Sequence, residues 1–153
     1  MVGPVGSLGE RYRLFFREFV RLARARGFQP FATREERNHR EFHTSRTGFS
    51  YKVSFDKDGY FRVELRIRID PGDRAENALA FDDLRQQSRA IEASLGRLIW
   101  YTKPDVQTHR IYARRTGIVE SSRDELEELT RWGLDQLVKF QSEFDPRLER
   151  LRL

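Results

Sequence analysis

Apolar and polar residues alternate strictly in the middle of the chain. In residues 48–55 (GFSYKVSF) and 61–69 (FRVELRIRI), every second residue is apolar. This alternation is typical of strands with one face on a core and the other in solvent. The short DKDG segment between the two runs predicts a β-hairpin. Same-face pairing requires Phe55 opposite Phe61, which places Lys52 opposite Glu64 and gives Gly59 the left-handed position of the turn.

Helical spacing replaces this alternation at both ends of the chain. Ser7 and Glu10 form a capping box, and the apolar stripe that follows continues to a stop at Gly27. Ser122 and Glu125 form a second capping box before a long final helix.

Proline and glycine set further expected boundaries. We expect the final helix to end at Pro146, because proline disrupts helix interiors. A helix over 74–96 is expected between Asp73, or a neighbour, as its cap and Gly96 as its stop. Pro71 and Gly72 are expected to end the strand before it.

Three further segments are candidates for strands. Residues 97–102 (RLIWYT) and 109–115 (HRIYARR) predict two short strands joined by a turn at 103–105, and residues 39–45 (HREFHTS) could form an edge strand. The element order is then α-β-β-β-α-β-β-α. It predicts a single α+β domain over 1–153, with 1–6 as a disordered lead. Its mainly antiparallel sheet would have four to five strands, with helices packed on one face, because each strand is apolar on only one side.

Composition narrows the functional classes. The 153 residues carry a net charge of +5 and contain no cysteine, so thiolate chemistry and disulfides are excluded. No apolar run approaches the ~20 residues of a membrane span, and the first residues do not resemble a signal peptide. We therefore expect a cytoplasmic protein that does not enter a membrane. The positive charge permits an acidic partner such as nucleic acid, although the arginine bias is equally typical of a GC-rich genome.

The central hairpin resembles the D…E-x-K pattern with which restriction-type nucleases hold a metal ion. The predicted register argues against that chemistry, because Lys52 and not a carboxylate lies beside Glu64. Asp56 and Asp58 fall in the turn, where aspartate is common for backbone reasons, and Arg66 stands in place of the lysine. We expect no catalytic residue and no metal at this hairpin.

Two histidines also raise the question of a metal. His39 and His43 have the spacing of ligands on a helix, but on a strand they would be ~13 Å apart. The alternative is that both histidines lie on a polar edge strand and bind no metal. The role of the two histidines stays open. No Walker or dinucleotide-binding motif is present, so we expect no cofactor.

An arginine-bearing sheet face is the strongest functional candidate. The outward row of the hairpin holds Ser50, Ser54 and the cations Lys52, Arg62, Arg66 and Arg68. If 109–115 joins the sheet, either Arg110, Tyr112 and Arg114 or Ile111 and Arg115 extend this face. Interleaved arginine, serine and tyrosine suit contact with phosphates and bases. The alternative is an ordinary solvated sheet face.

The final helix is the second candidate surface. Trp132, Leu134 and Val138 lie partly off its main apolar stripe. A helix that is apolar over a wide arc is buried on two sides. One side could contact a partner or a second copy of the chain, or both could pack within the core.

Four segments together resemble a known prokaryotic family. They are GFSYKVSF, VELRIRIDPGDRAENALAFDDL, IEASLGRLIW and ELEELTRWGLDQLVKFQSEFDPRL. The chain is similar to domain of unknown function 4268 over Leu8 to Leu148. Members of that family often form the C-terminal part of longer proteins with a restriction-nuclease-like domain. The resemblance implies an accessory or recognition module in defence or DNA metabolism, and it assigns no catalytic residues.

These observations lead to three functional hypotheses. The first is a non-catalytic module that binds DNA or RNA, or that supports a nuclease or another defence protein. The second is a protein-interaction module that forms a homodimer. The third is a metal-dependent nuclease, which the hairpin register disfavours.

Overall fold

The hairpin at the centre of the sheet pairs in the predicted register. In the computed structural model, which describes residues 7–69, 74–103 and 109–153, β2 (Phe49–Phe55) and β3 (Tyr60–Ile67) are antiparallel. Phe55 lies opposite Phe61, and Lys52 lies opposite Glu64. Gly59 has a φ of 86°, the left-handed conformation that the turn requires.

Three more strands complete one antiparallel sheet in the order β1-β2-β3-β5-β4. They are β1 (His39–His43), β4 (Ile99–Tyr101) and β5 (His109–Thr116). The expected edge strand is thus present but ends at His43, and the long strand β3 lies at the centre of the sheet. The predicted α+β class with a mainly antiparallel sheet is confirmed.

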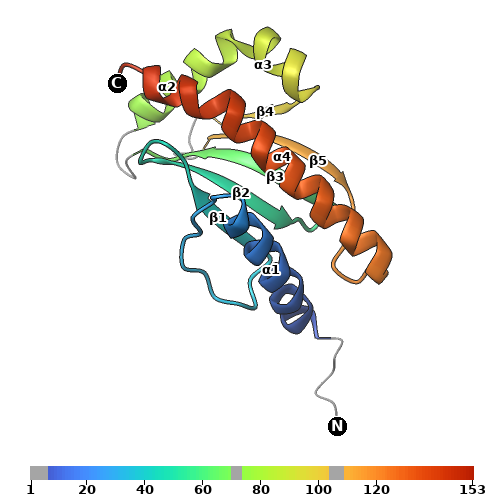
Figure 1. Ribbon diagram of the computed structural model, residues 1–153. Coiled ribbons are helices and arrows are strands. Elements are labelled where there is room, and N and C mark those ends of the chain that lie inside the picture. Colours follow the sequence, from blue (N-terminus) through green and yellow to red (C-terminus); the bar gives the residue numbers. More distant parts are fainter. Residues whose placement is uncertain (1–6, 70–73, 104–108) are drawn as a thin grey trace.

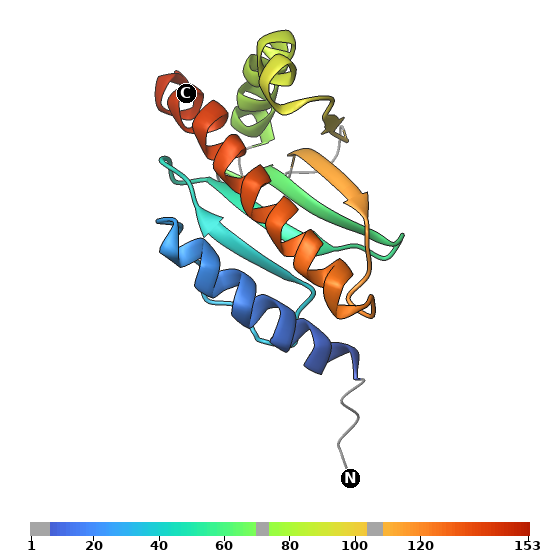
Figure 2. The same ribbon diagram turned by 45° about the vertical axis from the view of Figure 1, so that its right-hand side comes forward.

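The two long helices lie side by side on one face of the sheet (Figure 1, Figure 2). They are α1 (Leu8–Ala25) and α4 (Arg123–Arg150). Ser7 Oγ accepts a hydrogen bond from the Glu10 backbone N–H, and Ser122 Oγ accepts one from Glu125, which is the serine half of each predicted capping box. The Glu10 carboxylate binds Arg13. The shorter α2 (Arg74–Gln86) and α3 (Ser88–Leu95) lie near the C-terminal half of α4 (Figure 1).

One aromatic-rich core fills the space between helices and sheet. Its largest fully buried side chains come from every layer: Phe16 and Phe19 of α1, Tyr51, Phe61 and Leu65 of the hairpin, Phe81 and Leu84 of α2, and Phe140 and Phe144 of α4. Burial of a large apolar side chain stabilises a fold by about 1.5–3 kcal/mol. The continuous apolar core therefore lies on the inner face of the sheet.

The single helix expected over 74–96 is wrong: the chain breaks it at Gln87. This residue has φ −98° and ψ 11°, and its side chain donates to Asp83 Oδ1 and accepts from Arg147 of α4. The contact with α4 fixes the bend, and the pattern of apolar residues contains no signal for it.

The expected end of the final helix at Pro146 is also wrong, because α4 continues to Arg150. Proline removes one backbone hydrogen bond, but tertiary contacts hold the last turn in place. Leu148 is fully buried, and Arg46 Nη1 donates to the carbonyl oxygens of Leu148 and Leu151 at 2.9 and 2.7 Å. These contacts substitute for a conventional helix cap.

Several expected features lie outside the described residues. These are the disordered lead at 1–6, the Pro71–Gly72 stop and the cap at Asp73, and part of the turn at 103–105. The strand before the stop already ends at Ile67, two residues earlier than the expected run. Within the described part of the chain, no helix is both long and apolar enough to cross a membrane.

Candidate nucleic-acid interface

The outer face of the sheet brings most of the predicted cations together. The registers of β2, β3 and β5 place Ser54, Arg62 and Arg114 in one cross-strand row, Lys52, Glu64 and Tyr112 in the next, and Ser50, Arg66 and Arg110 in a third. The open alternative for β5 is resolved in favour of Arg110, Tyr112 and Arg114. Ile111 is buried on the inner face, and Arg115 reaches Glu128 of α4 at 3.8 Å. Arg68 follows the end of β3 and is exposed.

The centre of this face is occupied by an oppositely charged pair. Glu64 is only 1% exposed, and Lys52 beside it is half-buried. Burial raises the pKa of Glu64 although Lys52 and Arg110 oppose the rise, and burial lowers the pKa of Lys52 although Glu64 opposes the fall. Glu64 Oε2 accepts no hydrogen bond within the described structure, and Arg110 Nε lies 3.8 Å from it. The alternative of an ordinary solvated sheet face therefore does not describe its centre.

Arg66 is held by a carboxylate from the neighbouring edge strand. Its Nη1 donates to both oxygens of Glu41, at 3.1 and 3.2 Å, and Ser50 Oγ donates to Glu41 Oε1 at 2.8 Å. Burial disfavours the ionised form of Glu41, but Ser50 and Arg66 outweigh it and lower the pKa of this carboxyl group. Arg66 therefore has part of its hydrogen-bonding capacity already used.

Arg62 is held in the same way at the turn. Its Nε donates to Asp56 Oδ2 at 2.9 Å, and its guanidinium lies 4.5 Å from the centroid of the Tyr112 ring. Asp56 Oδ1 accepts the backbone N–H groups of Asp58 and Tyr60, so the turn aspartate has the backbone role that the sequence predicts. The result is a rigid arginine above an aromatic ring.

Three of the six predicted cations keep substantial exposure. Arg114 is exposed with its guanidinium 4.0 Å from the centroid of Tyr60, and Arg110 lies 5.7 Å from the centroid of Tyr101. Arg68 is exposed, and its backbone N–H donates to Gly48 at 2.8 Å. Arginine stacked on a tyrosine keeps its edge N–H groups directed outward for an anion.

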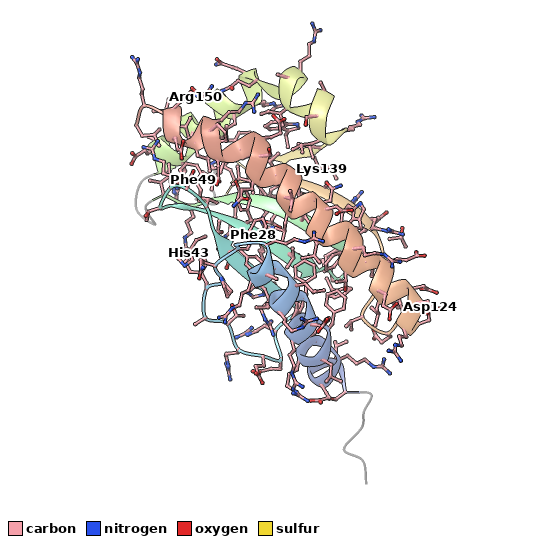
Figure 3. All side chains as sticks on the ribbon, in the orientation of Figure 1. Phe28, His43, Phe49, Asp124, Lys139 and Arg150 are labelled. Carbon is pink, nitrogen blue, oxygen red and sulfur yellow. The ribbon has the colours of Figure 1, made fainter. Side chains whose placement is uncertain are left out.

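Two hollows adjoin this face at its β1 edge. The hollow of about 340 Å³ is lined in part by His43, Ser50, Arg66 and Arg68, and the hollow of about 450 Å³ in part by Arg34, Arg37 and His39. Phe31 and Glu41 line both. Figure 3 shows His43 at the margin of the molecule, away from α4.

The geometry gives no support to the nuclease pattern. Among residues 7–69, 74–103 and 109–153, no three His, Asp or Glu side chains lie where they could hold a metal ion. The neighbours of Glu64 across the sheet are Lys52 and Tyr112, and Asp56 is bound to Arg62. His39 and His43 lie at opposite ends of β1, and the third histidine, His109, is buried against Phe81 on the inner face.

The second predicted surface, on the final helix, is largely core. Leu134 is only 2% exposed and belongs to the core, which excludes it from a partner surface. Trp132 is partly buried, and its ring meets Phe61 edge-on at 6.1 Å. Val138 alone of the three is exposed, at 42%.

Sequence reasoning missed two residues of the site. They are Glu41, whose carboxylate binds Arg66, and Phe31, the exposed aromatic residue at the β1 edge of the sheet. Glu41 lies in a segment without a clear pattern, and Phe31 lies between elements. Alternation along β1 would place Glu41 beside Lys52 once β1 was accepted as a strand. No local signal indicates that Phe31 packs on His43.

Comparisons with known proteins identify the family of the chain. The model of the family described as Domain of unknown function (DUF4268) matches residues 11–148. The chain belongs to this DUF4268 family. A search of curated proteins found no match. Among solved structures, the chain is similar to YbjN from E. coli, a candidate transcription regulator, with 12% identity, a TM-score of 0.45, and coverage of 83% of this chain and 87% of that one.

Proposed function

We propose that this DUF4268 chain is a non-catalytic module that binds nucleic acid through the outer face of its sheet. The observation that carries the proposal is the clustering of Lys52, Arg62, Arg66, Arg110 and Arg114 on three adjacent strands, on the face that the core does not use. Tyrosine rings lie beneath two of these arginines. Phosphate contacts supply most of the affinity of such surfaces, and arginine supplies paired donors for them.

The proposal extends to a role beside a nuclease. Members of the family that the chain resembles often accompany a restriction-nuclease-like domain, which is the support for an accessory or recognition role in defence or DNA metabolism. The chain would then contribute affinity for the substrate, and its partner would supply the chemistry.

A salt-dependent binding measurement tests the first part. Arg68, Arg110 and Arg114 are the most suitable residues to replace together by alanine, because none of the three donates a side-chain hydrogen bond within the described structure and the one ion pair among them, Arg110 with Glu64, is long at 3.8 Å. Binding of labelled DNA and RNA is measured by fluorescence anisotropy from low to moderate salt. Each lost phosphate contact reduces the slope of log K against log salt by about 1, so we expect a slope lower by about 2–3 and a correspondingly weaker affinity.

The matched control removes the same charge from elsewhere. Arg24, Arg89 and Arg150 are exposed on three helices, and their joint replacement by alanine changes the net charge equally. The proposal requires the control variant to bind within about twofold of the wild type, since only long-range attraction is lost. No binding to any nucleic acid at low salt, or an equal loss in both variants, would refute it.

Self-association is a second candidate, supported by a different surface. A hollow of about 970 Å³ lies between α1 and α4, lined in part by Leu14, Leu22 and Leu126, and Leu14 is 44% exposed. Its rim carries Glu18 and Arg131, so a second copy related by a twofold axis could match opposite charges across it. Light scattering at high concentration tests this: a mass that stays monomeric rejects the homodimer, and a dimer that Leu14→Asp dissociates supports it.

A further inference from the structure

Phe31 is an exposed aromatic residue on a rigid backbone. Its side chain is 41% exposed, yet its backbone N–H donates to Glu41 at 2.9 Å, and the adjacent Pro30 forms a β-bridge with Phe42. The segment thus extends the sheet beyond β1. A single exposed apolar residue is common on protein surfaces, so the surroundings of Phe31 must decide whether it has a role.

Those surroundings include a stacked ring and cations. The Phe31 and His43 rings stack with their centroids 3.8 Å apart and an interplanar angle of 27°. Phe31 separates two hollows of about 340 and 450 Å³, which fall within the size range of small-ligand pockets. The first hollow contains Arg66 and Arg68, and the second contains Arg34 and Arg37.

The cations of the first hollow are not equally available. Arg66 is bound to Glu41, and a third arginine there, Arg46, is occupied by the carbonyl groups at the end of α4. Arg68 has no side-chain partner among the described residues. The hollow therefore offers one guanidinium for an anion beside an aromatic stack.

A ring stack next to a guanidinium that has no side-chain partner in the described part of the chain matches the chemistry of an unpaired nucleotide. In a duplex both faces of each base are covered by its neighbours, whereas a single strand can turn a base onto an aromatic side chain. The phosphate of that nucleotide would lie within reach of an arginine such as Arg68. A smooth duplex offers no base face to Phe31.

We infer that the β1 edge binds single-stranded nucleic acid, with an unpaired base stacked on the Phe31–His43 pair and the adjoining phosphate on Arg68. This inference rests on the proposed function, because the strand would continue from the edge onto the outer face of the sheet. DNA and RNA both present an unpaired base and a phosphate, so the inference applies to single strands of either.

The test compares probes that differ only in their bases. Fluorescence anisotropy at low salt is measured with a 12-nucleotide dT strand, the same backbone with abasic sites, the equivalent RNA strand, and a duplex of equal length. Stacking of one base is worth roughly 5- to 150-fold in affinity. We expect Phe31→Ala to weaken binding of the dT and RNA strands by that factor, and to leave the abasic strand and the duplex unchanged.

Two further variants separate stacking from general effects. Phe31→Trp keeps a ring and should preserve binding, whereas Leu79→Ala removes a 63% exposed apolar residue on α2 and should change nothing. Thermal melting confirms that each variant is folded. If the wild type binds duplex and single strands equally and Phe31→Ala binds like the wild type, this inference is overturned and the proposed function stands. If the wild type binds none of the probes, both are overturned.

Discussion

Lys52 and Glu64 face each other across β2 and β3 at the centre of the outer sheet face, and neither is fully solvated. Glu64 is 1% exposed, and its Oε2 accepts no hydrogen bond in the described part of the chain. Burial raises the pKa of Glu64 and lowers that of Lys52. Both directions mean that lost hydration outweighs the attraction between the two groups.

Removing one member of this pair should cost more than removing both. We expect Lys52→Met to destabilise the protein by about 1–3 kcal/mol at pH 7, because Glu64 then stays buried with only the arginines to offset its charge, and Arg110 at 3.8 Å makes no hydrogen bond to it. The double variant Lys52→Met, Glu64→Gln should be close to the wild type. Urea denaturation of the three proteins measures both differences.

The pH dependence gives an independent check. A carboxyl group whose pKa is raised by folding opposes folding when ionised, so its cost is relieved as the pH falls through the raised pKa. The deficit of Lys52→Met should therefore shrink between pH 7 and about pH 5. Two results would contradict this account: Lys52→Met as stable as the wild type at pH 7, or a loss of stability in Lys52→Met that grows as the pH falls.

Asp56 should show the opposite pH behaviour. Burial disfavours its charge, but the backbone N–H groups of Tyr60 and Asp58 and the side chain of Arg62 outweigh it, and the pKa is lowered. A lowered pKa stabilises the fold above about pH 3.9 and loses that effect as the pH falls. We expect Asp56→Asn to lose about 1–2 kcal/mol at pH 7 and to approach the wild type as the pH falls through the lowered pKa of Asp56. Asp58→Asn, in the same turn, is the control, and a pH-independent deficit of Asp56→Asn would argue against the mechanism.

The hairpin could be predicted from sequence because its information is local. Strict alternation and one turn glycine determine which residues share a face, so the pairing of Lys52 with Glu64 followed from the sequence alone. The same information cannot report burial. Whether Glu64 is solvated depends on long side chains from β2 and β5 that cover it, and those contacts are set by tertiary structure.

The failures at Gln87 and Pro146 have the same origin. Local rules favour a continuous helix through Gln87, but Arg147 of α4 binds the Gln87 side chain where the helix breaks. They also favour a helix end at Pro146, but Arg46 binds the backbone of the turn that follows the proline. The sequence left open whether Leu134 lies in the core or on a partner surface, because that depends on how α4 packs in the tertiary structure. At the candidate site, the alternation of residues along the strands predicts which arginines share a face. The contact between Glu41 and Arg66 could not be predicted, because it depends on where β1 lies in the sheet.

Tyr51 links the central hairpin to α4 through a buried hydrogen bond. Its hydroxyl donates to Asp145 Oδ1 at 2.5 Å, and the ring is fully buried. Burial, together with Asp145, raises the pKa of Tyr51, so the hydroxyl stays protonated and donating. We expect Tyr51→Phe to lose about 1.5–3 kcal/mol of stability in chemical denaturation. Tyr60→Phe, on the partly exposed outer face, should change stability little, and equal effects of the two variants would reject the assigned role.

Gly133 allows α4 to approach the aromatic core. A Cβ at this position would lie 2.8 Å from Phe19 Cε2 and 2.8 Å from Phe61 Cε2. Alanine improves helix propensity by about 1 kcal/mol, but overpacking of a core costs about 1–3 kcal/mol. We expect Gly133→Ala to lower the melting temperature, whereas Ser142→Ala, at an exposed position of the same helix, should not. A higher melting temperature for Gly133→Ala would show that α4 can move away from the sheet.

Glu41 should limit the affinity of the outer face for nucleic acid. It holds Arg66 through both carboxylate oxygens and also accepts from Ser50. Glu41→Gln keeps the shape of the side chain but removes its charge, so Arg66 is released to contact a phosphate. We expect about fivefold tighter binding at low salt and a salt dependence steeper by about 1 in log–log slope.

The same change should weaken the fold. The lowered pKa of Glu41 means that its ionised form stabilises the native state, and we expect Glu41→Gln to lose about 1–2 kcal/mol. Glu149→Gln, an exposed residue near the end of α4, changes the net charge equally and should alter neither property. Tighter binding together with lower stability, seen only in Glu41→Gln, would mean that this carboxylate restrains Arg66 at a cost in affinity. Unchanged or weaker binding by the folded variant would remove Arg66 from the binding surface.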